Sequence, residues 1–246
     1  MIRNKKRSKL SGFQDVVYYL NFCLITIHLD FQIRFVFSEL AYFYFLKSIE
    51  VIEKEAIEVF ILAGGESRRM GTDKGLLNFQ GMPMILHIIK LLDTLNLKTS
   101  IISSNKEYLK FGKPLYTDII PKKGPMGGLY TALEYSKAPM VLLLACDMPS
   151  INKEGIQSLM TVAEPGKITV ATDSERISPL LACYPKSVIE KVEKAILADE
   201  LKMQDFVSKQ PHVILNLNAL ENTAILRNIN TREELQAAEN KLIDGE

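Results

Sequence analysis

The sequence predicts an α/β fold, a single three-layer domain with a mostly parallel, Rossmann-like sheet. Strand-like and helix-like segments alternate from residue 57 onward, which indicates consecutive βα units. The segment 140–145 is nearly all aliphatic, as expected for a central parallel strand buried on both faces. A glycine-rich loop with clustered cations directly follows the apolar segment 59–62, which is typical of a buried strand that ends beside a ligand.

The first half of the domain is predicted from apolar periodicity and loop composition. Strands or extended segments are expected at residues 57–63, 76–79, 99–103 and 115–117. Pro83 suits the first turn of a helix. Apolar residues then recur at the spacing that buries one helix face, at Ile85, Ile88, Ile89, Leu92 and Leu95. Residues 124–128 are a loop by composition, and a helix is expected over 129–135.

The second half continues the alternation after the aliphatic strand 140–145, which runs into Cys146-Asp147-Met148-Pro149. Helices are expected near residues 153–163 and 187–198, and strands near 168–171, 180–184 and 213–217. Thr231 is expected to open the last helix, because Glu234 follows three residues later as in a capping box.

The composition limits the class of protein. The 246 residues suffice for one sizeable α/β domain, and the formal net charge of +1 argues against a general nucleic-acid binder. The three cysteines, Cys23, Cys146 and Cys183, form no C-x-x-C pair, which fits a reducing cytoplasm without a disulfide framework. The three histidines show no metal-ligand spacing. We therefore expect a cytoplasmic protein.

Residues 1–55 are expected to form an N-terminal extension outside the domain of residues 56–246. Residues 1–50 hold 11 of the 20 aromatic side chains. Their apolar run, residues 16–29, is shorter than the roughly 20 residues that span a bilayer, so a membrane partner is not expected. Three interpretations stay open: a coding sequence that starts near Val51, a peripheral membrane helix, and a partner-binding helix.

The segment 62–74, LAGGESRRMGTDK, is the most informative part of the chain. Gly64 and Gly65 let the backbone approach a ligand, and their N–H groups can point at anionic oxygens. Arg68, Arg69 and Lys74 add three cations, so the loop suits a nucleotide triphosphate. Neither G-x-G-x-x-G nor G-x-x-x-x-G-K-[ST] fits these residues, which disfavours a Rossmann dinucleotide site and a P-loop.

The pattern LAGG-x-S-x-RMG-x-DK resembles the molybdenum cofactor guanylyltransferases of the nucleotidyltransferase superfamily, and matching motifs follow in order over residues 57–242. The resemblance implies a nucleotidyltransferase sheet and transfer of GMP from GTP to the terminal phosphate of the molybdenum cofactor (molybdopterin). The products would be molybdopterin guanine dinucleotide and pyrophosphate. It implies GTP and molybdopterin as partners, Mg²⁺ as cofactor, and molybdoenzyme apoproteins or their chaperones as recipients.

Asp147 and Lys74 are the expected catalytic residues. Asp147 stands directly after the most hydrophobic strand, and open α/β sheets bind ligands outside the carboxyl ends of strands. Mg²⁺ prefers one or two carboxylates plus phosphate oxygens, and the Cys-Asp-x-Pro run resembles the family's metal motif. Asp147 is therefore expected to bind Mg²⁺, the alternative being a loop cap before Pro149. The resemblance gives Lys74 the role of neutralising the phosphates.

The resemblance also implies nucleotide contacts at the end of the first strand, from Leu62, Ala63, Gly64 and Gly65. Asp118 matches a nucleotide-contacting aspartate upstream of the family's G-P-x-x-G loop, or is a turn residue. The family often has Asn after the second core strand. Here Ser103 occupies that position, and Asn105 could reach instead. Asn230 could donate an oxygen to the metal or simply end a strand.

Alternatives to the guanylyltransferase are a cytidylyltransferase for the same pterin, a sugar-phosphate nucleotidyltransferase, and a GTP-binding adaptor without turnover. Gly64 and Asp73 favour guanine, because cytidine relatives usually carry Ala at the position of Gly64. No Ser/His/Asp or Cys/His arrangement indicates acyl chemistry.

Overall fold

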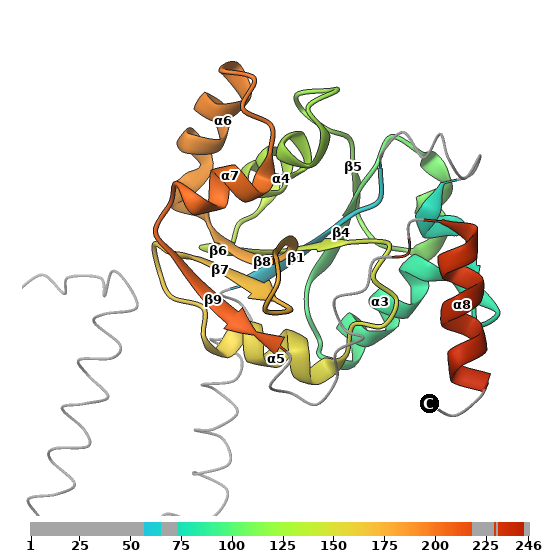
Figure 1. Cartoon of the computed structure of the whole chain (residues 1–246). Coiled ribbons are helices and arrows are strands. Elements are labelled where there is room, and N and C mark those ends of the chain that lie inside the picture. Colours follow the sequence, from blue (N-terminus) through green and yellow to red (C-terminus); the bar gives the residue numbers. More distant parts are fainter. Residues whose placement is uncertain (1–56, 65–72, 218–228, 230, 244–246) are drawn as a thin grey trace, which may run out of the picture. The chain divides into compact units, whose positions relative to one another are not determined.

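A seven-stranded sheet forms the middle layer of the domain, with strand order β5-β4-β1-β6-β8-β7-β9 (Figure 1). The computed structural model describes residues 57–64, 73–217, 229 and 231–243. The strands of this sheet are β1 (Ile57–Leu62), β4 (Thr99–Ile102), β5 (Leu115–Tyr116), β6 (Met140–Ala145), β7 (Ile168–Thr172), β8 (Ile177–Pro185) and β9 (His212–Asn216). A separate hairpin pairs β2 (Asn78–Phe79) with β3 (Met82–Pro83).

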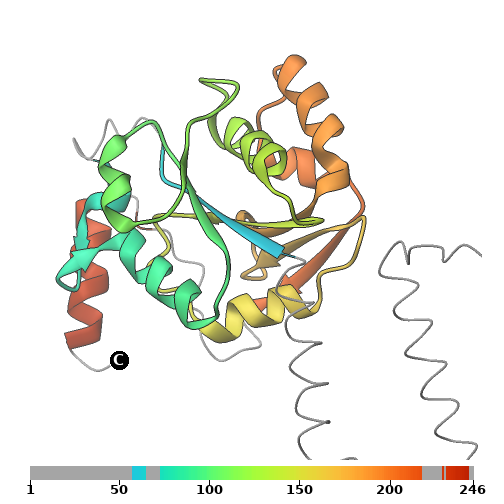
Figure 2. The same cartoon turned by 180° about the vertical axis from the view of Figure 1, so that it is seen from behind.

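Helices flank the sheet on both sides. The α-helices are α3 (Met84–Thr94), α4 (Gly124–Tyr135), α5 (Lys153–Thr161), α6 (Ile189–Leu197), α7 (Met203–Ser208) and α8 (Arg232–Ile243). The 3₁₀ helices are η1 (Lys74–Leu76), η2 (Lys106–Phe111) and η3 (Lys186–Val188). The views from front and back agree that α4, α6 and α7 cover one face, while α3 and α5 cover the other (Figures 1 and 2).

Strand direction confirms the mostly parallel sheet. β1 pairs in parallel with β4 and β6, β4 with β5, and β7 with β9. Only β8 runs antiparallel to its neighbours in the described sheet, β6 and β7. The chain proceeds from β1 to β4 on one side and returns to β6 on the other. β1 therefore lies where the strand order reverses, the usual ligand-binding place of such sheets.

Alternating side chains of β1 and β6 fill two apolar clusters. Phe60, Val141 and Leu143 belong to the cluster under α4, α6 and α7, whereas Ile61 and Leu142 belong to the one over α3 and α5. Because successive strand residues point to opposite faces, a strand covered on both faces must be apolar throughout. This burial explains why the predicted strand 140–145 matches β6 at both ends.

A smaller cluster attaches the C-terminal helix α8 beside α3 and the hairpin. Leu235 and Ala238 of α8 pack against Phe79, Met84 and Ile229. The Glu234 N–H donates to the Thr231 hydroxyl oxygen over 3.1 Å, which confirms the predicted N-terminal cap. Figures 1 and 2 both show α8 next to the start of α3.

Residues 124–128 are not the predicted loop, because they form the first turn of α4. Pro125 lies in this first turn, where its missing N–H costs no helix bond. The glycines serve close packing. A Cβ atom on Gly127 would lie 2.8 Å from the Ile120 carbonyl oxygen, and one on Gly128 would lie 2.7 Å from a terminal carbon of Leu62. Glycine composition was therefore misleading about local structure at this position.

The other differences between the predicted and the observed elements are small or concern short elements. The segment predicted as extended over 76–79 begins as the η1 turn, and the helix predicted over 187–198 begins with η3. The helix α7 was not predicted. Within the described residues, no helix is long and apolar enough to cross a membrane. The predicted extension, residues 1–55, lies outside the described residues, so that domain boundary stays a prediction.

The substitution Gly127→Ala tests the packing role of this glycine. Alanine is the better helix former by about 1 kcal/mol, so without steric conflict the change would stabilise α4. Because the new Cβ would meet a backbone oxygen, we expect the free energy of unfolding to fall by about 1–3 kcal/mol in urea titrations. Gly128→Ala should cost less, since the end of the Leu62 side chain can move. A gain in stability for Gly127→Ala would contradict the packing role.

Candidate active site

The carboxyl ends of four parallel strands bring the predicted site residues to one edge of the sheet. In the register of the sheet, Leu62 lies between Ile102 and Ala145, and Ile102 lies opposite Tyr116. Gly64, Ser103, Asp118 and Asp147 follow these four strand ends. The Ala63 N–H extends the ladder to the Ile102 carbonyl over 2.9 Å, and the Cys146 N–H donates to the Leu62 carbonyl over 3.1 Å. Leu62, Ala63 and Gly64 thus lie at the same edge as Asp147, and their nucleotide contacts stay predictions.

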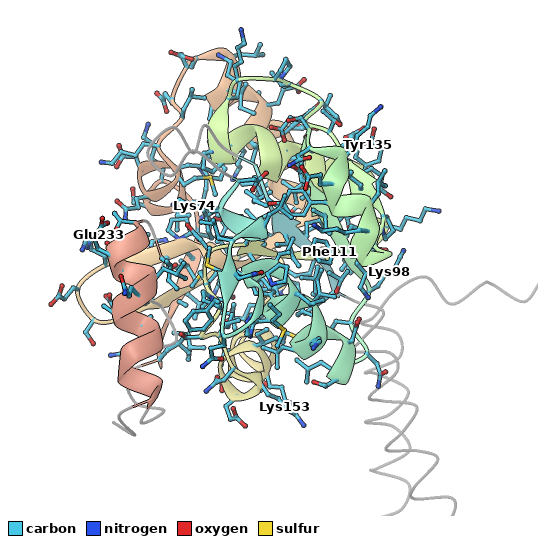
Figure 3. All side chains as sticks on the ribbon, turned by 90° about the vertical axis from the view of Figure 1, so that its right-hand side faces the viewer. Lys74, Lys98, Phe111, Tyr135, Lys153 and Glu233 are labelled. Carbon is cyan, nitrogen blue, oxygen red and sulfur yellow. The ribbon has the colours of Figure 1, made fainter. Side chains whose placement is uncertain are left out.

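Lys74 and Asp147 are in direct contact. The Lys74 Nζ donates to Asp147 Oδ2 over 3.2 Å, and the two side chains are 23% and 13% exposed. Figure 3 shows Lys74 on the side of the molecule opposite Lys98, whose ammonium donates to Glu58 at the start of β1. The two residues expected to be catalytic, 73 positions apart in the chain, therefore share one ion pair at the carboxyl edge.

The second carboxylate oxygen of Asp147 is available to a cation. Oδ1 is buried and has no hydrogen-bond partner among the described residues. A buried carboxylate oxygen without a partner is costly, so the structure around it favours a bound positive group. The backbone of Asp147 is fixed separately, since its carbonyl accepts from the Ile229 N–H over 2.9 Å. The main chain of Asp147 is therefore anchored, while its Oδ1 is not bonded to any described residue.

Asp73 organises the turn that carries Lys74. Its carboxylate caps η1 by accepting from the Gly75 N–H over 3.3 Å. The same carboxylate accepts from the Asn105 side-chain amide over 3.3 Å and from the Tyr108 hydroxyl. A hydrogen-bonded turn of this kind restricts where the long Lys74 side chain begins.

Ser103 lies at the expected edge but is engaged locally. Its hydroxyl oxygen accepts from the Asn105 N–H over 3.1 Å, and its own N–H donates to the Tyr116 carbonyl over 2.8 Å. A Cβ atom on Gly64 would lie 3.9 Å from the Ser103 Cα, so the two loops touch. Asn105 directs its amide to Asp73. The nucleotide contact assigned to Ser103 stays a prediction.

Asp118 lies over the first turn of α4. Its Cγ would be 3.9 Å from a Cβ atom on Gly127, and the following N–H, that of Ile119, donates to the Thr131 hydroxyl over 3.0 Å. The Asp118 Oδ1 is buried without a hydrogen-bond partner among the described residues. Burial raises the pKa of this carboxyl group above its usual value. The ionised form therefore gains from any ligand that donates a hydrogen bond to it.

Sequence reasoning missed Tyr108 and gave Asp73 no structural role. The available signals were an aspartate directly before Lys-Gly and an Asn at the start of the η2 turn, both typical caps.

Gly65, Arg68, Arg69 and Asn230 lie outside the described residues, so their predicted roles stay predictions.

Comparison with known sequences gives a consistent family. The model of the MobA-like NTP transferase domain matches residues 59–213. A probable molybdenum cofactor guanylyltransferase from Flavobacterium johnsoniae is 41% identical over 182 residues, which cover 74% of this chain and 95% of the relative. A molybdenum cofactor guanylyltransferase from Shewanella loihica is 30% identical over 187 residues, covering 73% of this chain and 94% of the relative.

Solved structures share the fold. The molybdopterin-guanine dinucleotide biosynthesis protein A from Archaeoglobus fulgidus superposes with a TM-score of 0.63 at 22% identity, covering 76% of this chain and 99% of that one. A nucleotidyl transferase from Methanothermobacter gives 0.62 at 11% identity, covering 78% and 99%. Since the family model spans more than half of the 246 residues and the sheet has the same architecture, the chain belongs to the MobA-like NTP transferase domain family.

Proposed function

We propose that this nucleotidyltransferase transfers GMP from GTP to the terminal phosphate of molybdopterin, releasing pyrophosphate. The observation that carries the proposal is the Lys74–Asp147 pair at the carboxyl edge of the sheet. Relatives named for this activity align over nearly their whole length, which supports the choice of substrates. We further infer that molybdoenzyme apoproteins or their chaperones receive the product, and that the protein works in the cytoplasm.

The chemistry asks mainly for positioning and electrostatic stabilisation. The pterin phosphate is anionic near neutral pH and attacks the α-phosphorus of GTP in line with the departing pyrophosphate. No general base is needed for this attack. Lys74 stabilises the charge on the phosphate oxygens as a compact cation on a flexible stem. The backbone of Leu62, Ala63 and Gly64 would line the nucleotide. Ser103 would lie beside it, because its Cα is 3.9 Å from where a Cβ atom on Gly64 would be.

The residues present fit a magnesium ion. The oxygen that would hold it is Oδ1 of Asp147, which is buried and has no hydrogen-bond partner among the residues that the structure describes. In the described part of the chain, no group of three His, Cys, Asp or Glu side chains could hold a metal by itself. This agrees with Mg²⁺, which commonly binds through one or two carboxylates and the substrate's phosphates. When bound, Mg²⁺ neutralises charge on the phosphate oxygens.

Asp118 is the proposed hydrogen-bond acceptor for the nucleotide. Its buried Oδ1 lacks a donor among the described residues, and GTP offers N–H and hydroxyl donors. Leaving such an acceptor unsatisfied is costly, so a nucleotide that places a donor at this oxygen should bind more tightly than one that does not.

The decisive experiment measures pyrophosphate release by the full-length chain with Mg²⁺ and molybdopterin, comparing GTP with CTP, ATP and UTP. Release with GTP alone supports the proposal. Release with CTP would keep the site but change the product. Binding of GTP without release would favour a GTP-binding adaptor.

Asp147→Ala should remove Mg²⁺-dependent turnover while leaving the fold intact, because it deletes the carboxylate proposed to hold the metal. We expect pyrophosphate release to fall by about 100-fold or more. The matched control is Asp93→Ala, which deletes the carboxylate of an exposed ion pair with Lys113 and should leave turnover unchanged. Equal activity of Asp147→Ala and the wild type would remove Asp147 from the mechanism.

Lys74→Ala should reduce kcat/KM for GTP by about 100-fold if the ammonium is a preorganised cation. Lys113→Ala is the control, since it removes a lysine from the exposed Asp93 pair. Steady-state pyrophosphate release measures both variants. A loss below about threefold at Lys74 would be too small for a preorganised cation.

Asp118→Asn should weaken GTP binding but stabilise the free protein at neutral pH. Because burial raises the folded-state pKa, ionisation of Asp118 costs stability once the pH exceeds its ordinary value of 3.8. The gain from Asn should therefore shrink to nothing as the pH falls below 3.8. Urea titrations over a pH series and GTP titration calorimetry measure the two effects. An Asp118→Asn variant less stable than the wild type at pH 7 would contradict the cost assigned to the buried, ionised Asp118 carboxylate.

A further inference from the structure

A buried tyrosine lies beneath the turn that carries Lys74. Tyr108, in η2, is fully buried and belongs to the apolar cluster on the α3 side of the sheet. Its hydroxyl donates to the Asp73 carboxylate, the residue directly before Lys74. With the Asn105 amide and the Gly75 N–H, three donors from two separate segments converge on this one carboxylate.

We propose that Tyr108 is a positioning residue, whose hydroxyl fixes Asp73 and, through the η1 turn, holds the Lys74 ammonium beside Asp147. The consequence for catalysis rests on the function proposed above. The effect of Tyr108 on the position of the Lys74 ammonium involves only residues of this chain, so it can be tested without a substrate.

The hydroxyl is more than a core-filling group. Burying it among apolar side chains is unfavourable unless it finds a partner, and phenylalanine would fill the same space without that cost. Burial, followed by the charge interactions with neighbouring acidic groups, raises the pKa of Tyr108 well above its usual range. The hydroxyl therefore stays protonated and remains a donor to the Asp73 carboxylate.

The space at Gly75 shows how closely the Tyr108 hydroxyl approaches the main chain next to Lys74. A Cβ atom at Gly75, the residue directly after Lys74, would lie 2.5 Å from the Tyr108 hydroxyl oxygen and 3.2 Å from Cys146. Tyr108 and Cys146 thus pack directly against the main chain next to Lys74. A lysine side chain has a flexible stem, so preorganisation of its ammonium must come from a fixed backbone and a partner such as Asp147.

The first test needs no nucleotide. Wild type, Tyr108→Phe and Tyr184→Phe, all full-length, are acetylated with a soluble N-hydroxysuccinimide ester, and the rate at each lysine is read by mass spectrometry. Lys74 should react several-fold faster in Tyr108→Phe, while the exposed Lys110 serves as reference. Tyr184→Phe is the matched control, because it also removes a buried hydroxyl, one that donates to the Pro179 carbonyl over 2.8 Å.

Unchanged Lys74 labelling in Tyr108→Phe would overturn the proposal. So would equal acceleration in Tyr184→Phe, since that would indicate general loosening. If Tyr108→Phe does not fold, Asp73→Asn replaces it, because the amide is a weaker acceptor for the same donors, and Lys74 labelling is expected to rise as well.

The second test uses turnover. Tyr108→Phe should lower kcat/KM for GTP about tenfold, as expected for losing a hydrogen bond to a charged group. In a Lys74→Ala background the same change should add less than about twofold, because both act through one cation. Fully additive losses would contradict positioning. A wild type that releases no pyrophosphate would refute the proposed function alone, since the labelling result decides on Tyr108 without it.

Discussion

The in-register pairing of β1 with β6 is the constraint on which the rest depends. All six residues of Ile57–Leu62 face Met140–Ala145, and nearly every side chain of both strands is buried. Parallel pairing without slippage puts the residues that follow Leu62 beside those that follow Ala145. A shift by one residue would turn the apolar side chains to the wrong faces and would separate Gly64 from Asp147. Core packing and site geometry thus have one cause.

Sequence patterns predict best where burial leaves little choice. The aliphatic run of β6 and the apolar spacing of α3 are local consequences of being covered, so their type and position could be predicted. Residues 124–128 could not, because glycine serves loops and tight packing equally well. Only the positions of the Ile120 carbonyl and Leu62 show that packing applies here. The reversed direction of β8 also depends on tertiary context, since its pattern suits either direction.

The candidate site also contains residues that sequence patterns predict and residues that they do not. Asp147 and Lys74 stand in short motifs next to recognisable strand ends, so their meeting at one edge follows from topology. Tyr108 carried no such signal, because its partner Asp73 is 35 positions away and its own surroundings are those of an ordinary core residue. A polar contact between distant segments is invisible to periodicity. The residues that orient a site are therefore harder to predict than those that touch its ligand.

The hydrogen bond from Ile229 to the Asp147 carbonyl has a consequence for biosynthesis. The strands that build the edge precede residue 150, but the bond that fixes the backbone of Asp147 comes from near the end of the 246 residues. α8 adds its contacts with Phe79 and Met84 later still. These four strands can pair as soon as β6 has been synthesised, whereas the hydrogen bond to Asp147 cannot form before Ile229 is present. The backbone of Asp147 therefore reaches its fixed position only after the residues up to Ile229 have folded back onto the edge of the sheet.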